Sequence, residues 1–156
     1  MLTSALIGAG ATALTDLWNT LLRRSLHVSS LNLCMLGRWV CHLRRGVFRH
    51  ASITSAPSCA HECGFGWVIH YAIGAALAVG FVWLVGSRWL QHPTALAALV
   101  FGECTTVFPF LILQPALGLG IASSQAPSPW RARLKSIGTH TVFGFGLYVM
   151  ALTFKA

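Results

Sequence analysis

Charged side chains are scarce in this chain of 156 residues, and acidic ones are nearly absent. Charged residues make up 9% of the sequence, and Asp and Glu together number 3, whereas about 25% of residues are charged in an ordinary soluble domain. A soluble core needs a charged shell, and this composition cannot supply one. Hydrophobic residues make up 55%, so the composition argues against a water-soluble protein.

Long apolar stretches fill most of the chain. A helix needs about 20 residues to cross the ~30 Å hydrocarbon layer, and four stretches reach that length. None alternates polar and apolar residues as the strand of a barrel would, and backbone groups in lipid must pair within their own segment. We therefore predict an all-α bundle of four transmembrane helices in a single domain, residues 1–156, with spans at 2–22, 66–86, 94–122 and 136–154.

The basic residues orient this bundle. Residues 23–65 carry six arginines and residues 123–135 carry three Lys or Arg, whereas residues 87–93 carry Arg88 alone. By the positive-inside rule, nine cations against one place the linkers 23–65 and 123–135 in the cytoplasm and both termini outside it. We therefore attribute the formal net charge of +8 to the orientation of the helices in the membrane and to contact with anionic lipid headgroups. We expect no nucleic-acid partner, because the sequence has none of the motifs of that class.

The segment of residues 31–45 within the first linker has helical periodicity. Cationic Arg38 and His42 lie on one side of the predicted helix. Two interpretations are open: an amphipathic helix lying on the cytoplasmic membrane surface between the first two spans, or an ordinary helix packed under the bundle. The apolar side is formed by Leu36, Trp39, Val40 and Leu43.

The cysteines are five in number, and four of them fall in the first linker. In the cytoplasm thiols stay reduced, so we expect no disulfide there. The cluster Cys59–Cys63, with Cys41, His42 and His50 before it, could suggest a zinc or redox site. Its spacing is not that of a zinc-binding Cys-x2-Cys pair, and we interpret these thiols as incidental.

Polar side chains inside the apolar stretches need a reason, because a charge at the centre of a span costs about 2.5–3.5 kcal/mol. Asp16, His70, Gln114 and His140 come from four different spans and are predicted to converge in the cytoplasmic leaflet, while Glu103 lies nearer mid-membrane. Three interpretations are open: interhelical hydrogen bonding, a proton or substrate pathway, and a metal or haem site with Asp16, His70 and His140 as weak candidate ligands. No cofactor is predicted.

Small residues and helix-breaking prolines shape the predicted helices. Three small-x3-small patterns indicate close helix contacts: Gly8-x3-Thr12-x3-Asp16, Gly74-x3-Ala78 and Gly118-x3-Ala122. The third stretch is irregular, because Pro109 and Pro115 each remove a helix hydrogen bond. We expect a tilted and kinked helix there, with a broken helix lining a cavity as the alternative.

These residues resemble a family of small bacterial inner-membrane proteins that is catalogued as a domain of unknown function. The resemblance implies a multi-spanning protein of the bacterial inner membrane, and it implies no reaction. In such a membrane, the orientation set by the basic residues puts both termini in the periplasm. The cysteines are not part of the family's pattern. The matching segments are 8–13 through Trp18, 37–39 with His42, 48–50, 66–67 with 70–71, and 114–123 continuing through Pro127 and Pro129 to His140 and Gly144.

The predicted function is that of a non-enzymatic polytopic membrane protein that assembles with itself or with a membrane partner. One alternative is a small transporter or proton-coupled channel that uses Asp16, His70, Gln114 and His140. The other is a membrane haem or metal protein built on the same residues. The secondary candidate site residues are Glu103, Arg38, His42 and His50.

Overall fold

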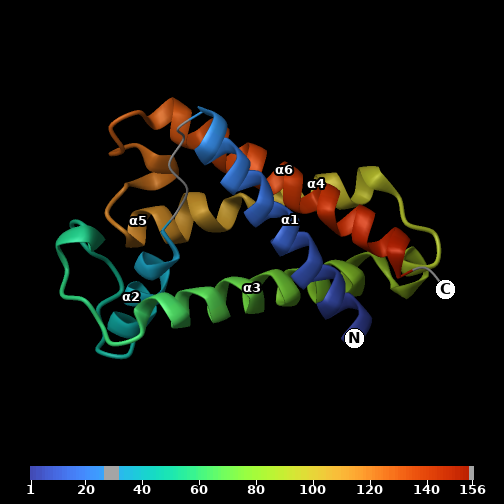
Figure 1. The fold of residues 1–156 in the computed structure, drawn as a ribbon, viewed down its shortest axis with the longest axis horizontal. Coiled ribbons are helices and arrows are strands. Elements are labelled where there is room, and N and C mark those ends of the chain that lie inside the picture. Colours follow the sequence, from blue (N-terminus) through green and yellow to red (C-terminus); the bar gives the residue numbers. More distant parts are fainter. Residues whose placement is uncertain (27–31, 155–156) are drawn as a thin grey trace. The chain divides into compact units, whose positions relative to one another are not determined.

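The structure describes residues 1–26 and 32–154, and within these ranges it contains helices and no strand. It is a computed structural model (Figure 1). The prediction of an all-α fold is confirmed. The α-helices are α1 (Leu2–Leu26), α2 (Leu33–Leu43), α3 (Glu62–Val85), α4 (Ala95–Thr105), α5 (Gln114–Ala116) and α6 (Pro129–Thr153), with 3₁₀ turns at Ile53–Ser55, Ser87–Leu90 and Ile121–Ser123.

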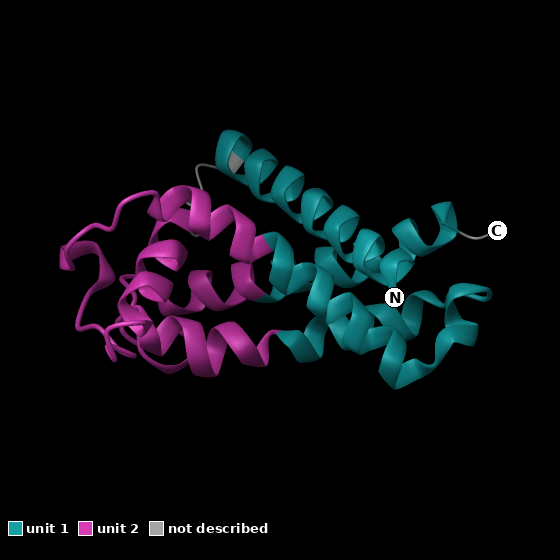
Figure 2. Ribbon diagram, turned by 90° about the horizontal axis from the view of Figure 1, so that it is seen from below, with its two compact units in different colours: residues 1–30, 71–105, 137–156 teal, residues 31–70, 106–136 magenta. Residues whose placement is uncertain are grey.

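The helices form two compact units (Figure 2). Unit 1 comprises residues 1–30, 71–105 and 137–156, and unit 2 comprises residues 31–70 and 106–136. The division passes through α3 and α6, each of which contributes residues to both units. The single domain expected over residues 1–156 stays a prediction.

Unit 1 is built around the aromatic ring of Phe81. This ring packs edge-on against Trp89, with 4.6 Å between the ring centroids. It also packs at a tilt against Phe101, with 4.9 Å between the centroids. Aromatic pairs of this kind add about 0.5–1.5 kcal/mol beyond the area that they bury. The buried core around it consists of Ile7, Ala11, Ala78, Phe81, Trp89, Ala98, Phe143, Leu147 and Ala151.

Close approach between the helices of unit 1 depends on glycine. A Cβ on Gly8 of α1 would lie 2.7 Å from the Cβ of Ala78 and would overlap the Gly74 carbonyl oxygen on α3. A Cβ on Gly144 of α6 would lie 2.6 Å from the Ala98 carbonyl oxygen on α4. Two of the predicted small faces, those of Gly8 and of Gly74-x3-Ala78, are therefore confirmed as helix contacts.

The third small pattern is wrong, because its residues do not share a helix. Gly118 has a φ of +88° and Ala122 a φ of +48°, so the chain has left the helical conformation after α5. Gly118 is needed for the turn itself, where a Cβ would also overlap the Ala51 carbonyl oxygen. The predicted third span, residues 94–122, accordingly ends six residues early, at Ala116.

The irregularity expected in that span takes the form of a π-helical turn. The turn occupies Pro109–Leu113 and joins α4 to α5, so that Ala95–Ala116 forms one rod of 22 residues. Proline at 109 cannot donate a backbone hydrogen bond, and a wider turn is one way for a helix to absorb that loss. The rod is irregular at the prolines, as predicted, and it continues through them.

The number of strongly apolar helices differs from the prediction. In the described residues, two helices are long and apolar enough to cross a membrane by composition, Glu62–Val85 and Ala95–Ala116, rather than four. Both α1 and α6 have 25 residues, which is sufficient length, but polar residues dilute their apolar sequence. In α1 these include Thr12, Thr15 and Asp16, and in α6 they are concentrated in its first half.

Candidate functional site

The four residues of the predicted central cluster are divided between the two units. Asp16 and His140 belong to unit 1, and His70 and Gln114 belong to unit 2. The convergence of all four in one site stays a prediction. Glu103, a secondary candidate, lies in unit 1.

In unit 1, His140 is held by the helix opposite it. Its Nδ1 lies 2.7 Å from Thr105 Oγ1, and that hydroxyl donates to the Gly102 carbonyl oxygen at 2.6 Å. A hydroxyl has one proton, so a Thr105 that donates to Gly102 accepts from His140 Nδ1–H. This arrangement leaves the lone pair of the neutral imidazole on Nε2. The residues bind α4 to α6 and orient the ring.

Other polar side chains of unit 1 also bridge helices. Asp16 of α1 makes a side-chain hydrogen bond with Tyr71 of α3. Thr139 of α6 donates to Asn19 of α1 at 3.3 Å, and Thr141 of α6 donates to the Glu103 carboxylate of α4. Each contact is of the interhelical type that holds membrane bundles together.

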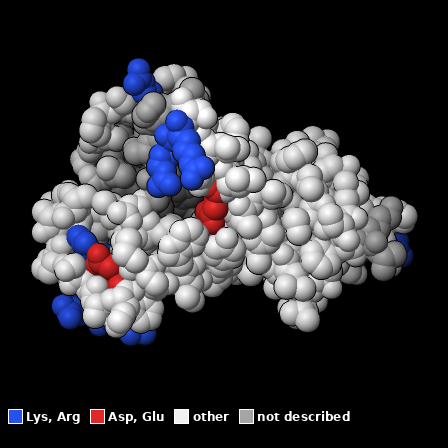
Figure 3. Space-filling model, in the orientation of Figure 1, with Lys and Arg blue, Asp and Glu red and all other residues white. Residues whose placement is uncertain are grey.

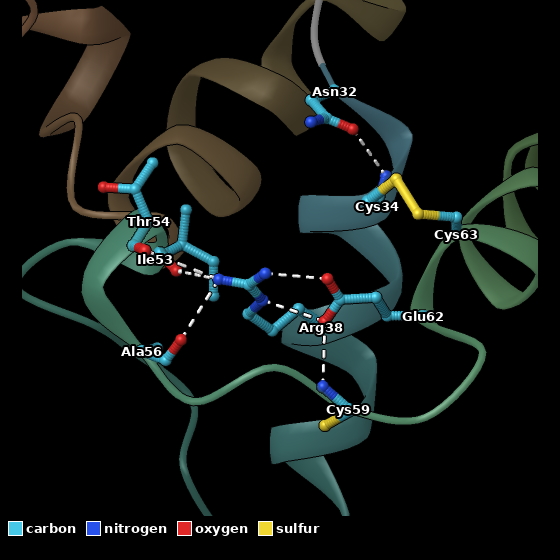
Figure 4. A network of polar contacts seen from close by, with 9 residues as sticks. All are labelled: Asn32, Cys34, Arg38, Ile53, Thr54, Ala56, Cys59, Glu62 and Cys63. Atoms are coloured by element: carbon cyan, nitrogen blue, oxygen red, sulfur yellow. Dashed lines mark hydrogen bonds and ion pairs between the residues drawn. A yellow bond between two sulfur atoms is a disulfide. The ribbon is translucent and has the colours of Figure 1, made fainter.

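In unit 2, a guanidinium group forms the centre of a polar network (Figure 4). Arg38 of α2 donates from Nε to Glu62 Oε2 at 2.9 Å and from NH2 to Glu62 Oε1 at 2.7 Å. Its NH1 donates to the carbonyl oxygens of Ile53 and Ala56, each at 3.1 Å. The side chains of Arg38 and Glu62 are 16% and 12% exposed. This two-pronged ion pair therefore fastens α2 both to the start of α3 and to the loop between them.

The network also sets the charge state of Glu62, which precedes the apolar stretch 66–86. The hydrogen bonds from Arg38 and from the Cys59 backbone N–H, the latter at 2.9 Å, hold the pKa of Glu62 at about 2, below its ordinary value of 4.5. Hydrogen bonds to a carboxylate favour its charged form. The same ion pair raises the pKa of Arg38. Glu62 is thus ionised at every physiological pH.

Two glycines allow α2 and α3 to meet at this point. A Cβ on Gly37 would overlap the Glu62 carbonyl oxygen, and a Cβ on Gly66 would overlap the Leu33 carbonyl oxygen. The backbones of the two helices are therefore in direct contact. This contact places the Arg38 side chain within reach of Glu62.

A pair of histidines lies next to the network. His42 Nδ1 is 2.8 Å from His50 Nε2, and the His42 side chain is buried, with 6% exposed. The His50 backbone N–H donates to the Ala116 carbonyl oxygen at 2.9 Å, which connects the pair to the end of α5. The two rings, with Arg45 and Val47, line an open cavity of about 270 Å³.

Helix α2 is present where a helix was predicted, and its cationic residues Arg38 and His42 point into unit 2 and make its polar contacts. Their partners, Glu62 and His50, come from later in the chain. Sequence reasoning had Arg38, His42 and His50 as secondary candidates and missed that Glu62 joins them.

A disulfide bond closes the same region. Cys34 of α2 is bonded to Cys63 of α3, so the expectation that these thiols stay reduced is wrong for this pair. Cys41, Cys59 and Cys104 carry free thiols. Within the described residues, no group of three or more His, Cys, Asp or Glu is placed to hold a metal ion.

The spacing along the chain held a signal for this arrangement. Cys34, Arg38 and Cys41 recur at intervals of four and three residues, which places them on one side of a helix. Glu62 is the single acidic residue of the linker 23–65, which makes it the one carboxylate available there to the six arginines. Sequence alone does not say which arginine pairs with Glu62.

The comparisons with known proteins agree with the resemblance seen in the sequence. No curated protein and no solved structure matches the chain. A family model described as a protein of unknown function (DUF2938) matches residues 5–154, which is nearly the full length and includes both units. The chain belongs to the DUF2938 family of proteins of unknown function.

Proposed function

We propose that this protein is an integral membrane protein of the bacterial inner membrane that acts by assembling with copies of itself. The observation that carries the proposal is the exposure of its most apolar helices. The apolar windows of α3 and of the α4–α5 rod have mean hydropathies of 2.1 and 2.0, yet 17% and 22% of their residues are buried. An equally apolar core helix of a soluble protein would be mostly buried.

The exposed side chains on these helices are large. Trp83 and Leu84 of α3 are 81% and 66% exposed, and Leu96 of α4 is 75% exposed. Wide areas of the surface drawn in Figure 3 carry no charged side chain. Continuous exposed apolar surface of this kind marks a membrane or protein contact, and lipid tails cover it without cost.

The more polar helix α1 supports the same environment, because its polar side is the buried one. Ser4, Thr12 and Thr15 are buried, at 2–4% exposed. The hydroxyls of Thr12 and Thr15 donate to the carbonyl oxygens of Gly8 and Ala11, at 2.8 and 2.9 Å. Leu2, Leu6, Leu17 and Leu21 are among its exposed side chains. A helix with satisfied polar groups inside and leucines outside is suited to lipid.

From this arrangement we infer that α1 and α6 cross the membrane as well. Helix α1 packs on α3 at Gly74, and α6 packs on α4 at Gly102, each within an apolar segment. Four spans keep the linkers 23–65 and 123–135 in the cytoplasm beside anionic headgroups and put both termini in the periplasm.

Self-assembly is supported by a row of small residues on the exposed side of α3. Ala72 and Ala76 are exposed, and a Cβ on Gly80 would meet nothing within 4 Å. These three positions repeat every four residues, the spacing at which small residues let two membrane helices approach. Unit 1 does not use this side of α3, so the row is available to a second copy.

The test is energy transfer between donor- and acceptor-labelled copies in lipid vesicles. We expect transfer above the level of random collisions for the natural protein, and a several-fold loss of association for Gly80→Leu, since leucine would keep the helix backbones apart. Ile73→Leu, which keeps the volume of another exposed α3 residue, should associate normally. Transfer at the random level for the natural protein would contradict assembly with itself.

A small transporter or proton-coupled channel is the second candidate. The π-helical turn at Pro109–Leu113 favours it, because such turns in membrane helices are frequent at functional sites. Two polar atoms of unit 2, Gln114 Oε1 and Thr106 Oγ1, are buried on the same rod with no hydrogen-bond partner among the described residues. A pathway for protons or substrate needs polar groups of this kind.

A further inference from the structure

Helix α2 and the segment leading into α3 are joined side by side by matched residues. Cys34 is bonded to Cys63, and one turn further along α2, Arg38 is paired with Glu62. Figure 4 shows the disulfide, the ion pair and then Cys59 following one another along α2. The two chain segments therefore run in opposite directions. Residues later in α2 lie beside residues earlier in the segment 59–63.

The next step along α2 brings two free thiols together. Cys41 lies seven residues, or two helical turns, beyond Cys34 and therefore on the same side of α2. On the facing segment, Cys59 lies close enough to Cys41 for the two thiols to influence each other electrostatically. The Cys59 backbone N–H donates to Glu62 Oε2 at 2.9 Å, which ties this cysteine to the ion pair. Both cysteines are partly exposed.

We propose that Cys41 and Cys59 are a second disulfide site, which is formed and reduced by exchange with an external disulfide of the glutathione or thiol-oxidoreductase class. The site stands on the pairing of the two segments: the disulfide Cys34–Cys63 and the ion pair Arg38–Glu62 join them, and the Cys59 backbone N–H bonds to Glu62. Cys41 continues the side of α2 that carries Cys34 and Arg38. It lies within unit 2 and does not depend on the proposed self-assembly.

The exchange balances as two successive displacements. The Cys41 thiolate attacks one sulfur of the external disulfide, forms a mixed disulfide and releases the first external thiolate. The Cys59 sulfur, as it loses its proton, then attacks the Cys41 sulfur and releases the second external thiolate. The protein loses two electrons and two protons, and the external disulfide gains them and becomes two thiols.

The surroundings assign the order of attack. Cys41 borders a second cavity, of about 220 Å³, which Gly37, Val40, Arg44, Phe65 and Ile69 also line, so an external disulfide can reach it. The interaction with Cys41, and then partial burial, raise the pKa of the Cys59 thiol. We therefore assign the first attack to Cys41, which borders the cavity, and the resolving step to Cys59. In a cytoplasmic linker, disulfides of this kind are transient or redox-sensing.

The test equilibrates the purified protein in detergent with glutathione buffers of rising oxidised-to-reduced ratio, followed by alkylation, trypsin digestion and mass spectrometry. We expect the number of alkylated cysteines to fall from three to one as a peptide pair linked through Cys41 and Cys59 appears, with Cys104 still alkylated. Cys59→Ser should instead trap the mixed disulfide of glutathione on Cys41, and Cys104→Ser should leave the linked pair unchanged.

Two results would overturn the proposal. One is that Cys41 and Cys59 both remain alkylated at every ratio at which Cys34–Cys63 is oxidised. The other is that Cys41 links to a second copy of the chain and not to Cys59. Circular dichroism of each variant confirms that the helices are retained, so that a failure to link is not caused by unfolding.

Discussion

Gly37→Ala is expected to destabilise the protein by more than about 2 kcal/mol, although it adds a single methyl group. Overpacking of a close contact ordinarily costs about 1–3 kcal/mol. Here the added carbon would overlap the Glu62 carbonyl oxygen and lie 2.8 Å from the Gly66 nitrogen. Backbone atoms cannot rotate away as a side chain does. The two helices must separate, and the Arg38–Glu62 pair between them must lengthen.

The matched control is Gly64→Ala, two residues after Glu62 in the same helix. A Cβ on Gly64 would meet nothing within 4 Å, so this variant should be neutral or gain up to about 1 kcal/mol, because alanine is the better helix former. The measurement is the thermal unfolding midpoint in one detergent. Equal midpoints for the Gly37 and Gly64 variants would show that α2 and α3 are not in backbone contact.

Arg38→Met is expected to cost at least about 2 kcal/mol of stability. Methionine keeps the length and apolar stem of arginine, but it removes the guanidinium donors to the Glu62 carboxylate and to two carbonyl oxygens. Hydrogen bonds to a charged group are worth about 1.5–3 kcal/mol, and removing one partner of a mostly buried ion pair leaves the other charge uncompensated. The stability of Arg38→Lys should fall between those of the natural protein and of Arg38→Met. An ammonium group keeps the positive charge, but it lacks the planar pair of donors that a guanidinium group offers to a carboxylate.

The pH dependence of unfolding checks which group is responsible. The pKa of Glu62 is about 2 in the folded protein against 4.5 ordinarily, so its contribution is complete above pH 4.5 and is lost as the pH falls from 4.5 towards 2. The natural protein should therefore lose stability relative to Arg38→Met over that interval. Two parallel curves would mean that Arg38 does not lower the pKa of Glu62.

The helices of this protein could be predicted from sequence because the apolar stretches are long and lack the alternation of a strand. The stretch 66–86 covers most of α3, the stretch 94–122 contains the α4–α5 rod, and Gly8 and Gly74 lie at a close helix contact, as their small-residue patterns predicted. Such features depend on neighbours along one helix. The sequence therefore carries them locally.

The polar site of unit 2 was only partly predictable, because its partners are distant in sequence. The periodicity put Arg38 and His42 on one side of a helix, but it did not say what that side contacts. The structure pairs Arg38 with Glu62, 24 residues later in the chain. The disulfide at Cys34 was missed for a different reason: orientation alone had argued for reduced thiols.

The limits of composition appear most clearly in α1. Its threonines lower its hydropathy, and by that measure it is not a spanning helix. The structure shows that the threonine hydroxyls are buried and bonded to the helix's own carbonyls, with leucines outside. A helix suits lipid when its polar groups are buried and its apolar side chains face outward. The mean hydropathy of the helix does not distinguish this arrangement from the reverse one.

The most direct measurement of the central claim is sedimentation of the protein from cell membranes washed with alkaline carbonate. We predict that the full chain stays in the pellet and is released only by detergent, because the proposed arrangement places the apolar sides of α1, α3 and α4 in lipid. Recovery of the folded protein in the supernatant without detergent would contradict a transmembrane arrangement, and the exposed leucines and tryptophan would then need another cover.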